Sequence, residues 1–501
     1  MNVLFKQLEE NYLQKGQALF TALTLIEWDQ ATEAPKEADE NTSKVVGILS
    51  DLYFSAYIND EVKTLMHEIC AQMESLDARE TSIFHELELL YERLETIPKQ
   101  EYREYSELTT LSLNVWERAK ESENFDVFAP TLEKIVNYKK KFASYRKKDK
   151  DTSIYDILLS DFEAGFDEEK LDEFFSLMKR ELVPFIQTVT QKTQNVDKSF
   201  NYKYFDKDKQ KEFCTFLANY IGFDFTKGVI KESAHPFTTN FHNKDVRITN
   251  HYYENNLESA IFSIIHEGGH AIYEMQVADE FTQTLVGEGT SMGMHESQSR
   301  FYENIIGRSE SFWKPIYQKL VELFEEQLGN VSLEQFILAI NKPERGFIRT
   351  EADELTYTLH VLIRYEIEKL LFEDKITVNE IPQIWNEKYK EYLGITPKND
   401  KEGCLQDVHW ACGDFGYFPS YALGSAIGAQ IYYYMKTQIP VDTYLAQGNL
   451  IPIKEFLKER IHKFGKTKNT DQILMNMTGE AFNPNYYVNY LKEKYERLYG
   501  A

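Results

Sequence analysis

The residue pattern best suited to chemistry is a pair of histidines four positions apart, His266 and His270, with Glu267 directly after the first. On a helix, positions i and i+4 lie on one face, so both imidazoles can reach one tetrahedral zinc ion. The carboxylate of Glu267 would then face a water molecule bound to that ion. The pattern predicts a zinc-dependent peptidase in which Glu267 acts as the general base.

The sequence around this motif is apolar, as in a buried helix. Residues 261–265 precede it, and Ala271 and Ile272 follow it. Gly268 and Gly269 each cost about 1 kcal/mol inside a helix relative to alanine. A helix packed against a substrate or a metal site needs small residues, so the two glycines favour a functional helix over a purely structural one.

A catalytic zinc site needs a third protein ligand and one open position. The metzincin extension of the motif is absent, because Tyr273 and Gln276 stand where that class has its Gly and His. A glutamate on a second helix is the alternative, and Glu296 follows the glycine-rich loop of residues 287–293. Considering the residues alone, three other ligands remain open: Glu288, Glu303 and His295.

The composition limits the kind of protein. The 501 residues include only 13 Pro and 23 Gly, and 42% are hydrophobic, which is ample for a large core. No linker rich in Pro, Gly or Ser interrupts the chain. We therefore expect one domain over residues 1–501, with a helical lobe of about residues 1–235 and a zinc-site lobe of about residues 236–501.

The charge and the cysteines indicate partners and location. A net charge of -25 argues against nucleic acid and anionic membranes as partners. The four cysteines form no CxxC pair, which is unlike a disulfide framework. Charged residues near the N-terminus are unlike a signal peptide, and no apolar run approaches the roughly 18 residues that span a bilayer. We expect a cytoplasmic protein.

Helical spacing of apolar residues is widespread and predicts the elements that position the motif. Segments with this spacing are Glu61–Leu94, Gln100–Glu121, Phe125–Arg146, Glu168–Thr193, Glu351–Phe372, Val378–Tyr392 and Tyr486–Leu498. Asp245–Thr249 differs, because it is rich in β-branched residues and alternates polar with apolar. It predicts a short strand just before the metal motif. Such a strand can pair with a peptide substrate, and a minor structural hairpin is the alternative.

Besides the histidine motif and His295–Arg300, six further segments stand in a characteristic order: Trp28–Pro35, Tyr155–Gly165, His235–Thr239, Asp245–Thr249, Ile348–Asp353 and Gly403–Trp410. With these motifs in this order, the chain resembles the thermostable carboxypeptidase family of zinc metallopeptidases, peptidase family M32. The resemblance implies a mainly α, saddle-like single domain with a deep substrate groove and a small β-sheet beside the zinc site. It also implies that Glu296 is the third zinc ligand and that the protein is a homodimer.

The resemblance further implies residues that stabilise the oxyanion of the transition state. Related helical zinc peptidases place a His and a Tyr in a similar downstream order, which here points to His409 and Tyr421. Tyr417 is the alternative for the phenol. The chain has 32 tyrosines, so without the resemblance neither would stand out.

A carboxypeptidase must also recognise a free C-terminal carboxylate, and arginine does this best through two parallel hydrogen bonds. Arg349 lies in the I-R-x-x-A-D element, which resembles the part of the family fold that closes one end of the groove. Arg247 and Arg300 are alternatives. A structural ion pair between Arg349 and Asp353, four residues later, is the competing interpretation.

Three further substrate-binding candidates are Tyr417, Asp407, in the G-x-x-Q-D-x-H-W element, and His235, for which packing beside Pro236 is the alternative. The expected activity is hydrolysis of the C-terminal bond of peptides with a free C-terminus. We expect broad specificity, release of single amino acids, and one Zn²⁺ that Co²⁺ or Mn²⁺ can replace. A zinc oligopeptidase or dipeptidyl carboxypeptidase is the second hypothesis. A non-catalytic peptide-binding protein is disfavoured, because the residues of the metal motif are intact.

Overall fold

Each segment with helical spacing contains a helix in the computed structural model of the protein, and capping residues decide where the helices begin. Glu61–Leu94 is two helices, α4 (Asp60–Cys70) and α5 (Ala78–Leu94), because Asp77 starts the second in a capping box. Asp353 likewise starts α17 (Glu354–Phe372) by accepting hydrogen bonds from backbone N–H groups of its first turn.

The structure describes residues 2–500, with the backbone alone for residues 36, 39, 40 and 43. The other helices of its N-terminal half are α1 (Val3–Leu8), α2 (Gln14–Thr32), α3 (Asp39–Tyr57), α6 (Lys99–Glu121), α7 (Ala129–Arg146), α8 (Ile154–Leu159), α9 (Glu168–Lys192) and α10 (Lys207–Ile221). Those of its C-terminal half are α11 (Leu257–Met275), α12 (Met292–Arg300), α13 (Glu310–Trp313), α14 (Tyr317–Leu323), α15 (Glu325–Leu328), α16 (Leu333–Ile340), α18 (Ile381–Leu393), α19 (His409–Cys412), α20 (Pro419–Gln438), α21 (Val441–Ala446), α22 (Ile451–Arg460), α23 (Thr470–Thr478) and α24 (Asn485–Tyr499).

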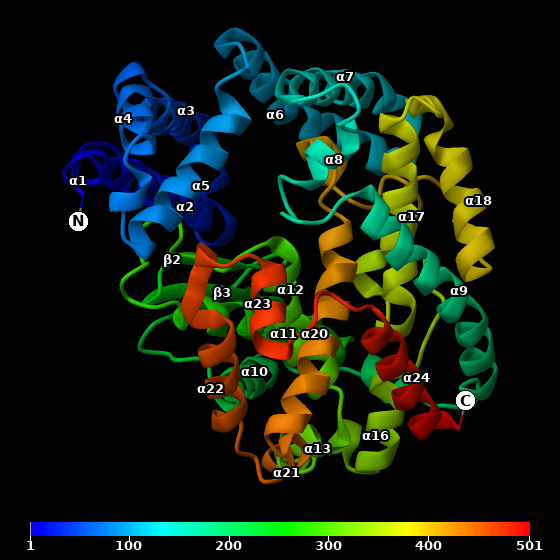
Figure 1. Cartoon of the computed structure of the whole chain (residues 1–501). Helices are drawn as coiled ribbons and strands as arrows, with labels where there is room; N and C mark the ends of the chain where they lie inside the picture. The colour runs from blue at the N-terminus through cyan, green and yellow to red at the C-terminus, as the bar shows by residue number, and fades with distance from the viewer. Residues whose placement is uncertain (1, 501) are drawn as a thin grey trace.

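One small sheet accompanies the helices and lies against α11 (Figure 1). Its order is β1 (Ile230–Glu232), β3 (Asp245–Asn250), β2 (Thr238–His242), with β3 parallel to β1 and antiparallel to β2. The predicted strand is present as β3, but it lies in the centre of the sheet. Its backbone is already paired on both sides, so the expectation that this strand pairs with a substrate is corrected. A peptide can add only to an edge strand.

The predicted mainly α fold is confirmed: the protein is 68% helical and forms a single domain. The larger hydrophobic cluster draws on residues 119–495, and a smaller one joins the N-terminal helices with Val286. The predicted lobe boundary near residue 235 falls within the larger cluster, and the division into two lobes stays a prediction. Among residues 2–500, no helix combines the length and the apolar character that crossing a membrane requires.

Close packing of α12 against both α11 and α20 positions the metal motif. A side chain at Gly269 on α11 would place its Cβ 2.8 Å from the backbone of Gln298 and Ser299 on α12. A side chain at Gly424 on α20 would meet the Cβ of Glu296 at 2.6 Å. Glycine at these two positions therefore allows the close approach that brings Glu296 beside α11.

Gly268 has a similar role on another side of α11. A Cβ at this position would lie 2.4 Å from the Cδ1 of Ile221 on α10. The two glycines of the motif thus make room for neighbouring helices. The expectation that they make room for a substrate or a metal is corrected, because the helix is crowded on those faces by other helices.

Candidate active site

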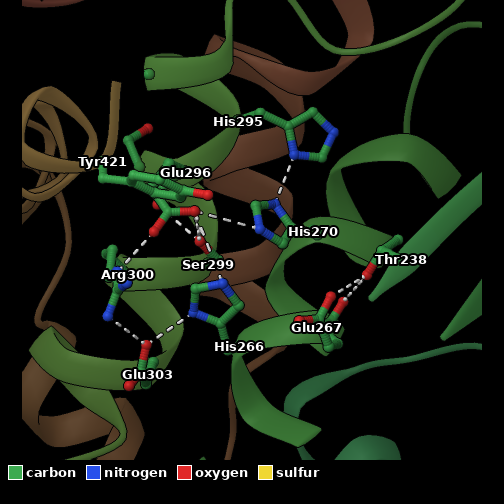
Figure 2. A network of polar contacts seen from close by, with 12 residues as sticks. Thr238, His266, Glu267, His270, His295, Glu296, Ser299, Arg300, Glu303 and Tyr421 are labelled. Atoms are coloured by element: carbon green, nitrogen blue, oxygen red, sulfur yellow. Dashed lines mark hydrogen bonds and ion pairs between the residues drawn. The ribbon is translucent and has the colours of Figure 1, made fainter. Parts of the chain in front are cut away.

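The side chains of His266 and His270 on α11 and Glu296 on α12 meet at one point (Figure 2). One possible ligand atom from each lies within 4.8 Å of the other two. The Nε2 atoms of His266 and His270 are 3.7 and 3.4 Å from Oε2 of Glu296. Two imidazole nitrogens and one carboxylate oxygen at this spacing fit a tetrahedral divalent ion with one position left open.

Two of the other candidates for the third ligand lie outside this cluster. Glu303 belongs to a π-helix, Phe301–Ile306, that continues from α12, and its Oε2 is 2.7 Å from Nδ1 of His266. It therefore contacts the side of the His266 ring that faces away from the cluster, as carboxylates commonly do behind the histidines of metal sites. Glu288 forms an ion pair with Lys466.

His295, the remaining candidate, contacts the other imidazole of the cluster. Its Nδ1 is 2.6 Å from Nδ1 of His270, and its Nε2 is 2.7 Å from Oε1 of Glu274. Burial lowers the pKa of His270 to about 3, so this imidazole is neutral at physiological pH, as a metal ligand must be. Glu274 was not among the residues predicted from the sequence.

Glu296 is held in place by its own helix. Its Oε1 accepts a hydrogen bond from Nε of Arg300 at 2.7 Å, and its Oε2 accepts one from Ser299 at 3.2 Å. Burial opposes ionisation of Glu296, but Arg300 and the two histidines outweigh it and hold the pKa of the carboxyl below its usual range. Arg300 also donates to Glu303 at 3.1 Å, so Glu296 and Glu303 share its guanidinium. Arg300 was an alternative to Arg349 as the residue that binds the substrate carboxylate.

Glu267 faces the sheet, on the side of α11 next to its two histidines (Figure 2). Its Oε2 accepts a hydrogen bond of 2.6 Å from the hydroxyl of Thr238 on β2. Burial raises the pKa of the Glu267 carboxyl, which makes its carboxylate a stronger proton acceptor. Thr238 was not identified as a site residue, although it lies in the resembling segment 235–239.

The three aromatic candidates lie together. Nε2 of His409, the first residue of α19, is 3.0 Å from the hydroxyl of Tyr421 in the first turn of α20. The ring of Tyr417 stacks on that of His409 at 5.4 Å. Burial lowers the pKa of His409 to about 3, so it is neutral. Tyr421 lies beside Glu296, which places this aromatic group next to the metal cluster (Figure 2).

Arg349 is 5% exposed and is paired with Asp407. Its Nε and Nη2 donate to Oδ1 of Asp407 at 3.0 and 2.8 Å, while Nε of Arg364 donates to Oδ2 at 2.6 Å. The anion beside Arg349 is therefore Asp407, and the alternative pairing with Asp353 is wrong, because Asp353 caps α17. The guanidinium of Arg349 lies 4.5 Å from the ring centre of Tyr421.

The buried ion pairs of Asp407 with Arg349 and Arg364 predict a large effect on stability. Replacing Asp407 with Asn leaves the buried Arg349 and Arg364 without their counter-charge, so we expect unfolding to become easier by about 3–5 kcal/mol. Urea unfolding of the metal-loaded protein measures this. Asp374→Asn is the matched control, since Asp374 pairs with Lys140 but its side chain is 83% exposed, and a change within about 0.5 kcal/mol is expected. Equal unfolding curves for both variants would contradict the prediction.

Arg247 and His235 lie apart from the metal cluster. Arg247 donates to both carboxylate oxygens of Asp245 at 2.8 Å, and its guanidinium lies 4.5 Å from the ring centre of Phe241. This places it on the face of β3 turned towards Trp28 of α2. His235 is exposed in the loop before β2. Within residues 2–500, neither side chain forms a hydrogen bond or ion pair with His266, His270 or Glu296.

A buried carboxyl group anchors the segment that carries His409. Glu368 of α17 accepts hydrogen bonds from Nε1 of Trp410 at 2.7 Å, from the backbone of Gly416 at 2.9 Å and from the hydroxyl of Tyr155 at 2.8 Å. Burial raises the pKa of Glu368 from 4.5 to about 7, although the three donors oppose this shift.

The pKa of Glu368 gives a prediction for stability against pH. Between about pH 4.5 and 7 the folded protein retains a proton on Glu368 that the unfolded chain has lost, so the stability this proton provides falls as the pH rises through that window. We expect wild type to lose stability relative to Glu368→Gln by up to about 1.4 kcal/mol per pH unit. Urea unfolding of both proteins at pH 5 and pH 7 checks this. A difference that does not vary with pH would contradict it.

Comparisons with known proteins agree over the whole chain. The family model described as carboxypeptidase Taq (M32) metallopeptidase matches residues 9–495. "Carboxypeptidase 1" of Bacillus subtilis is 42% identical over 479 residues, covering 95% of each chain. "Thermostable carboxypeptidase 1" of Pyrococcus furiosus is 34% identical over 497 residues, covering 99% of each. The crystal structure of M32 carboxypeptidase from Deinococcus radiodurans is similar with a TM-score of 0.95, at 30% identity over 100% of each chain.

Proposed function

Because the chain belongs to the carboxypeptidase Taq (M32) metallopeptidase family, it is a metallocarboxypeptidase, and we propose that it uses zinc to release single amino acids from peptides with broad specificity. The membership also confirms the resemblance inferred from the motifs. The observation that carries the proposal is the cluster of His266, His270 and Glu296, with Glu267 beside it on α11.

The donor set of this cluster suits zinc. Two imidazole nitrogens and one carboxylate oxygen are a common set of zinc ligands in peptidases, and cobalt or manganese can take the same place. When bound, the ion lowers the pKa of a water molecule and polarises the carbonyl of the bond to be cleaved.

Glu267 is the proposed general base, and the sheet orients it. Its carboxylate takes the proton of the attacking water and then delivers that proton to the leaving amine. Thr238 occupies Oε2, which leaves Oε1 available for the water. The edge strand β2 therefore fixes the direction in which the base points.

Tyr421 is the proposed donor to the oxyanion, and His409 is the proposed residue that orients its hydroxyl. Within residues 2–500, the buried Nδ1 of His409 has no hydrogen-bond partner. The proton of this neutral imidazole is therefore better placed on Nε2, where the oxygen of Tyr421 accepts it at 3.0 Å. The O–H of Tyr421 can then turn to donate to the developing oxyanion. Tyr417 supports the imidazole by stacking on it.

Arg349 is the proposed anchor for the substrate carboxylate. Three of its five N–H groups donate to Asp407 and to the hydroxyl of Tyr357, and two remain. Its contact with the Tyr421 ring supports an anchor close to the reacting bond, as release of single residues requires. Asp407 orients the guanidinium. His235 and Arg247 stay predictions as substrate contacts at the sheet.

The anchor role predicts a selective effect on substrate binding. Arg349→Lys keeps the positive charge but loses the planar fork, so we expect KM to rise about 10-fold to 100-fold with a smaller fall in kcat. Arg364→Lys is the matched control, because Arg364 donates to the same Asp407 and is fully buried. Steady-state kinetics measure both. An equal rise in KM for the two variants would contradict the anchor role.

We further propose that the protein is a cytoplasmic homodimer. The family resemblance supports the dimer, and the four unpaired cysteines suit a reducing compartment. Sedimentation velocity tests the assembly: a single species of twice the chain mass is expected, and a monomer at all concentrations would contradict it.

The mode of cleavage is tested with an N-terminally blocked peptide as the free acid and as the C-terminal amide, followed by mass spectrometry. The proposal predicts stepwise loss of single residues from the free acid alone, abolished by a chelator and restored by zinc. Cleavage of the amide, or release of dipeptides, would contradict it and support the helical zinc oligopeptidase or dipeptidyl carboxypeptidase instead.

A further inference from the structure

The two histidines of the metal cluster have different partners on the ring nitrogen that faces away from the cluster (Figure 2). Nδ1 of His266 is 2.7 Å from the carboxylate of Glu303. Nδ1 of His270 is 2.6 Å from another imidazole nitrogen, Nδ1 of His295. A direct carboxylate partner is common in metal sites, and the arrangement at His270 requires a separate explanation.

The positions of the nitrogens determine where the protons lie. Nε2 of His270 faces the cluster, 3.4 Å from Oε2 of Glu296, so it must be unprotonated to bind a metal. The proton of the neutral ring is then on Nδ1, and Nδ1 of His295 accepts it. His295 in turn carries its own proton on Nε2 and donates it to Oε1 of Glu274 at 2.7 Å.

Glu274 is a fixed end for this chain of donors. It is 3% exposed, and its Oε1 also accepts a hydrogen bond from the backbone of Gly289 at 2.9 Å. Its Oε2 accepts one from the side chain of Asn240 at 2.6 Å. Three donors from three segments of the chain hold this carboxylate, so it can keep His295 in a single orientation.

Asn240 connects the chain of donors to the strand that orients the base. It lies two residues after Thr238 on β2, and both side chains reach α11, where Glu267 and Glu274 are seven residues apart. Residues two apart on a strand share one face, and residues seven apart on a helix share one side. One strand thus supports both the base and the partner of a metal ligand.

We propose that His295 and Glu274 are positioning residues for the metal. Together they hold His270 in the tautomer that presents Nε2 to the ion, and they thereby set the affinity for zinc. This inference rests on the proposed assignment of His266, His270 and Glu296 as ligands. Without the pair, the His270 proton can move to Nε2, and a ring in that tautomer does not bind a metal.

Zinc affinity of the metal-free protein tests the proposal, measured by competition with a fluorescent chelator. We expect His295→Leu and Glu274→Gln to raise the Kd for zinc about 10-fold to 100-fold. His295→Asn should recover part of the loss, because its Oδ1 can accept the His270 proton. Glu258→Gln is the matched control on α11, since Glu258 is buried and paired with Lys198 at 3.3 Å, and its Kd should stay within about twofold of wild type.

Thermal unfolding separates positioning of the metal from general support of the fold. The proposal predicts that zinc raises the Tm of His295→Leu and Glu274→Gln less than it raises that of wild type, because the gain depends on Kd. A lower Tm of the metal-free variants with an unchanged gain from zinc would show a purely structural role and overturn the proposal. So would a Kd equal to that of wild type.

A double variant tests whether His295 and Glu274 act as one unit. His295→Leu combined with Glu274→Gln should bind zinc no more weakly than His295→Leu alone, because Glu274 acts through His295. Additive losses would overturn this. Glu296→Gln distinguishes an error in the ligand assignment from an error in the positioning role. If it binds zinc as tightly as wild type, the ligand assignment is wrong. If it loses zinc while the His295 and Glu274 variants keep it, only the positioning role is wrong.

Discussion

Glu267→Gln is expected to lower kcat/KM for peptide hydrolysis by about 10³-fold while zinc stays bound, because an amide cannot accept the proton of the attacking water. The amide oxygen can still accept the hydrogen bond from Thr238, so the local structure should persist. Kinetics on a short peptide, together with metal analysis of the purified variant, measure the effect.

Thr238→Val provides a graded comparison for this prediction. It leaves the Glu267 carboxylate in place but removes the hydroxyl that orients it. We expect a loss of about tenfold, well below that of Glu267→Gln. Retention of more than a tenth of wild-type activity in Glu267→Gln would contradict the role of this residue as the base.

Glu296→Gln is expected to weaken zinc binding by more than about 100-fold, since loss of a ligand should exceed the 10-fold to 100-fold cost of losing a residue behind one. Activity should fall in parallel and return only partly at high zinc concentration. The variant also leaves the buried Arg300 without one of its two carboxylate partners, so lower stability of the metal-free protein is expected. Chelator competition and thermal unfolding measure both effects.

Glu303→Gln is the control for the loss of Glu296. It removes the charge behind His266 but leaves the three proposed ligands in place. Its Kd for zinc should lie between those of wild type and Glu296→Gln. A Glu296→Gln protein that binds zinc no more weakly than Glu303→Gln would show that Glu296 is not a ligand.

Local spacing predicted the parts of the site that one helix determines. His266 and His270 lie on one face because they are four residues apart. Residues seven apart on an α-helix also share one side, and Glu274, seven residues after Glu267, contacts His295 from that side. Glu303 lies seven residues after Glu296 but in a π-helix, and it contacts His266. That signal was present in the sequence, although it did not separate Glu303 as a ligand from Glu303 as a partner of His266.

Contacts between distant segments could not be predicted in this way. Glu296 reaches the histidines only because Gly269 and Gly424 allow three helices to pack closely, and a sequence does not state which helices become neighbours. Arg349 pairs with Asp407, 58 positions away, so the local alternative at four residues was the wrong one.

The sheet shows the same limit. The predicted strand is present as β3, but its central position follows from pairing with β1 and β2, which carry little strand signal of their own. The edge strand β2, which holds Glu267 through Thr238, was therefore missed as part of the site.

A crystal structure of the zinc-loaded Glu267→Gln protein with a bound tripeptide, recorded at the zinc absorption edge, would locate both the metal and the substrate carboxylate. We expect one anomalous peak about 2.0–2.2 Å from Nε2 of His266, Nε2 of His270 and a carboxylate oxygen of Glu296. The C-terminal carboxylate of the peptide should face Arg349 and lie one residue beyond the peptide bond that is next to the metal. A peak at other residues would contradict the proposed metal site, and a carboxylate two or more residues beyond that bond would contradict release of single amino acids.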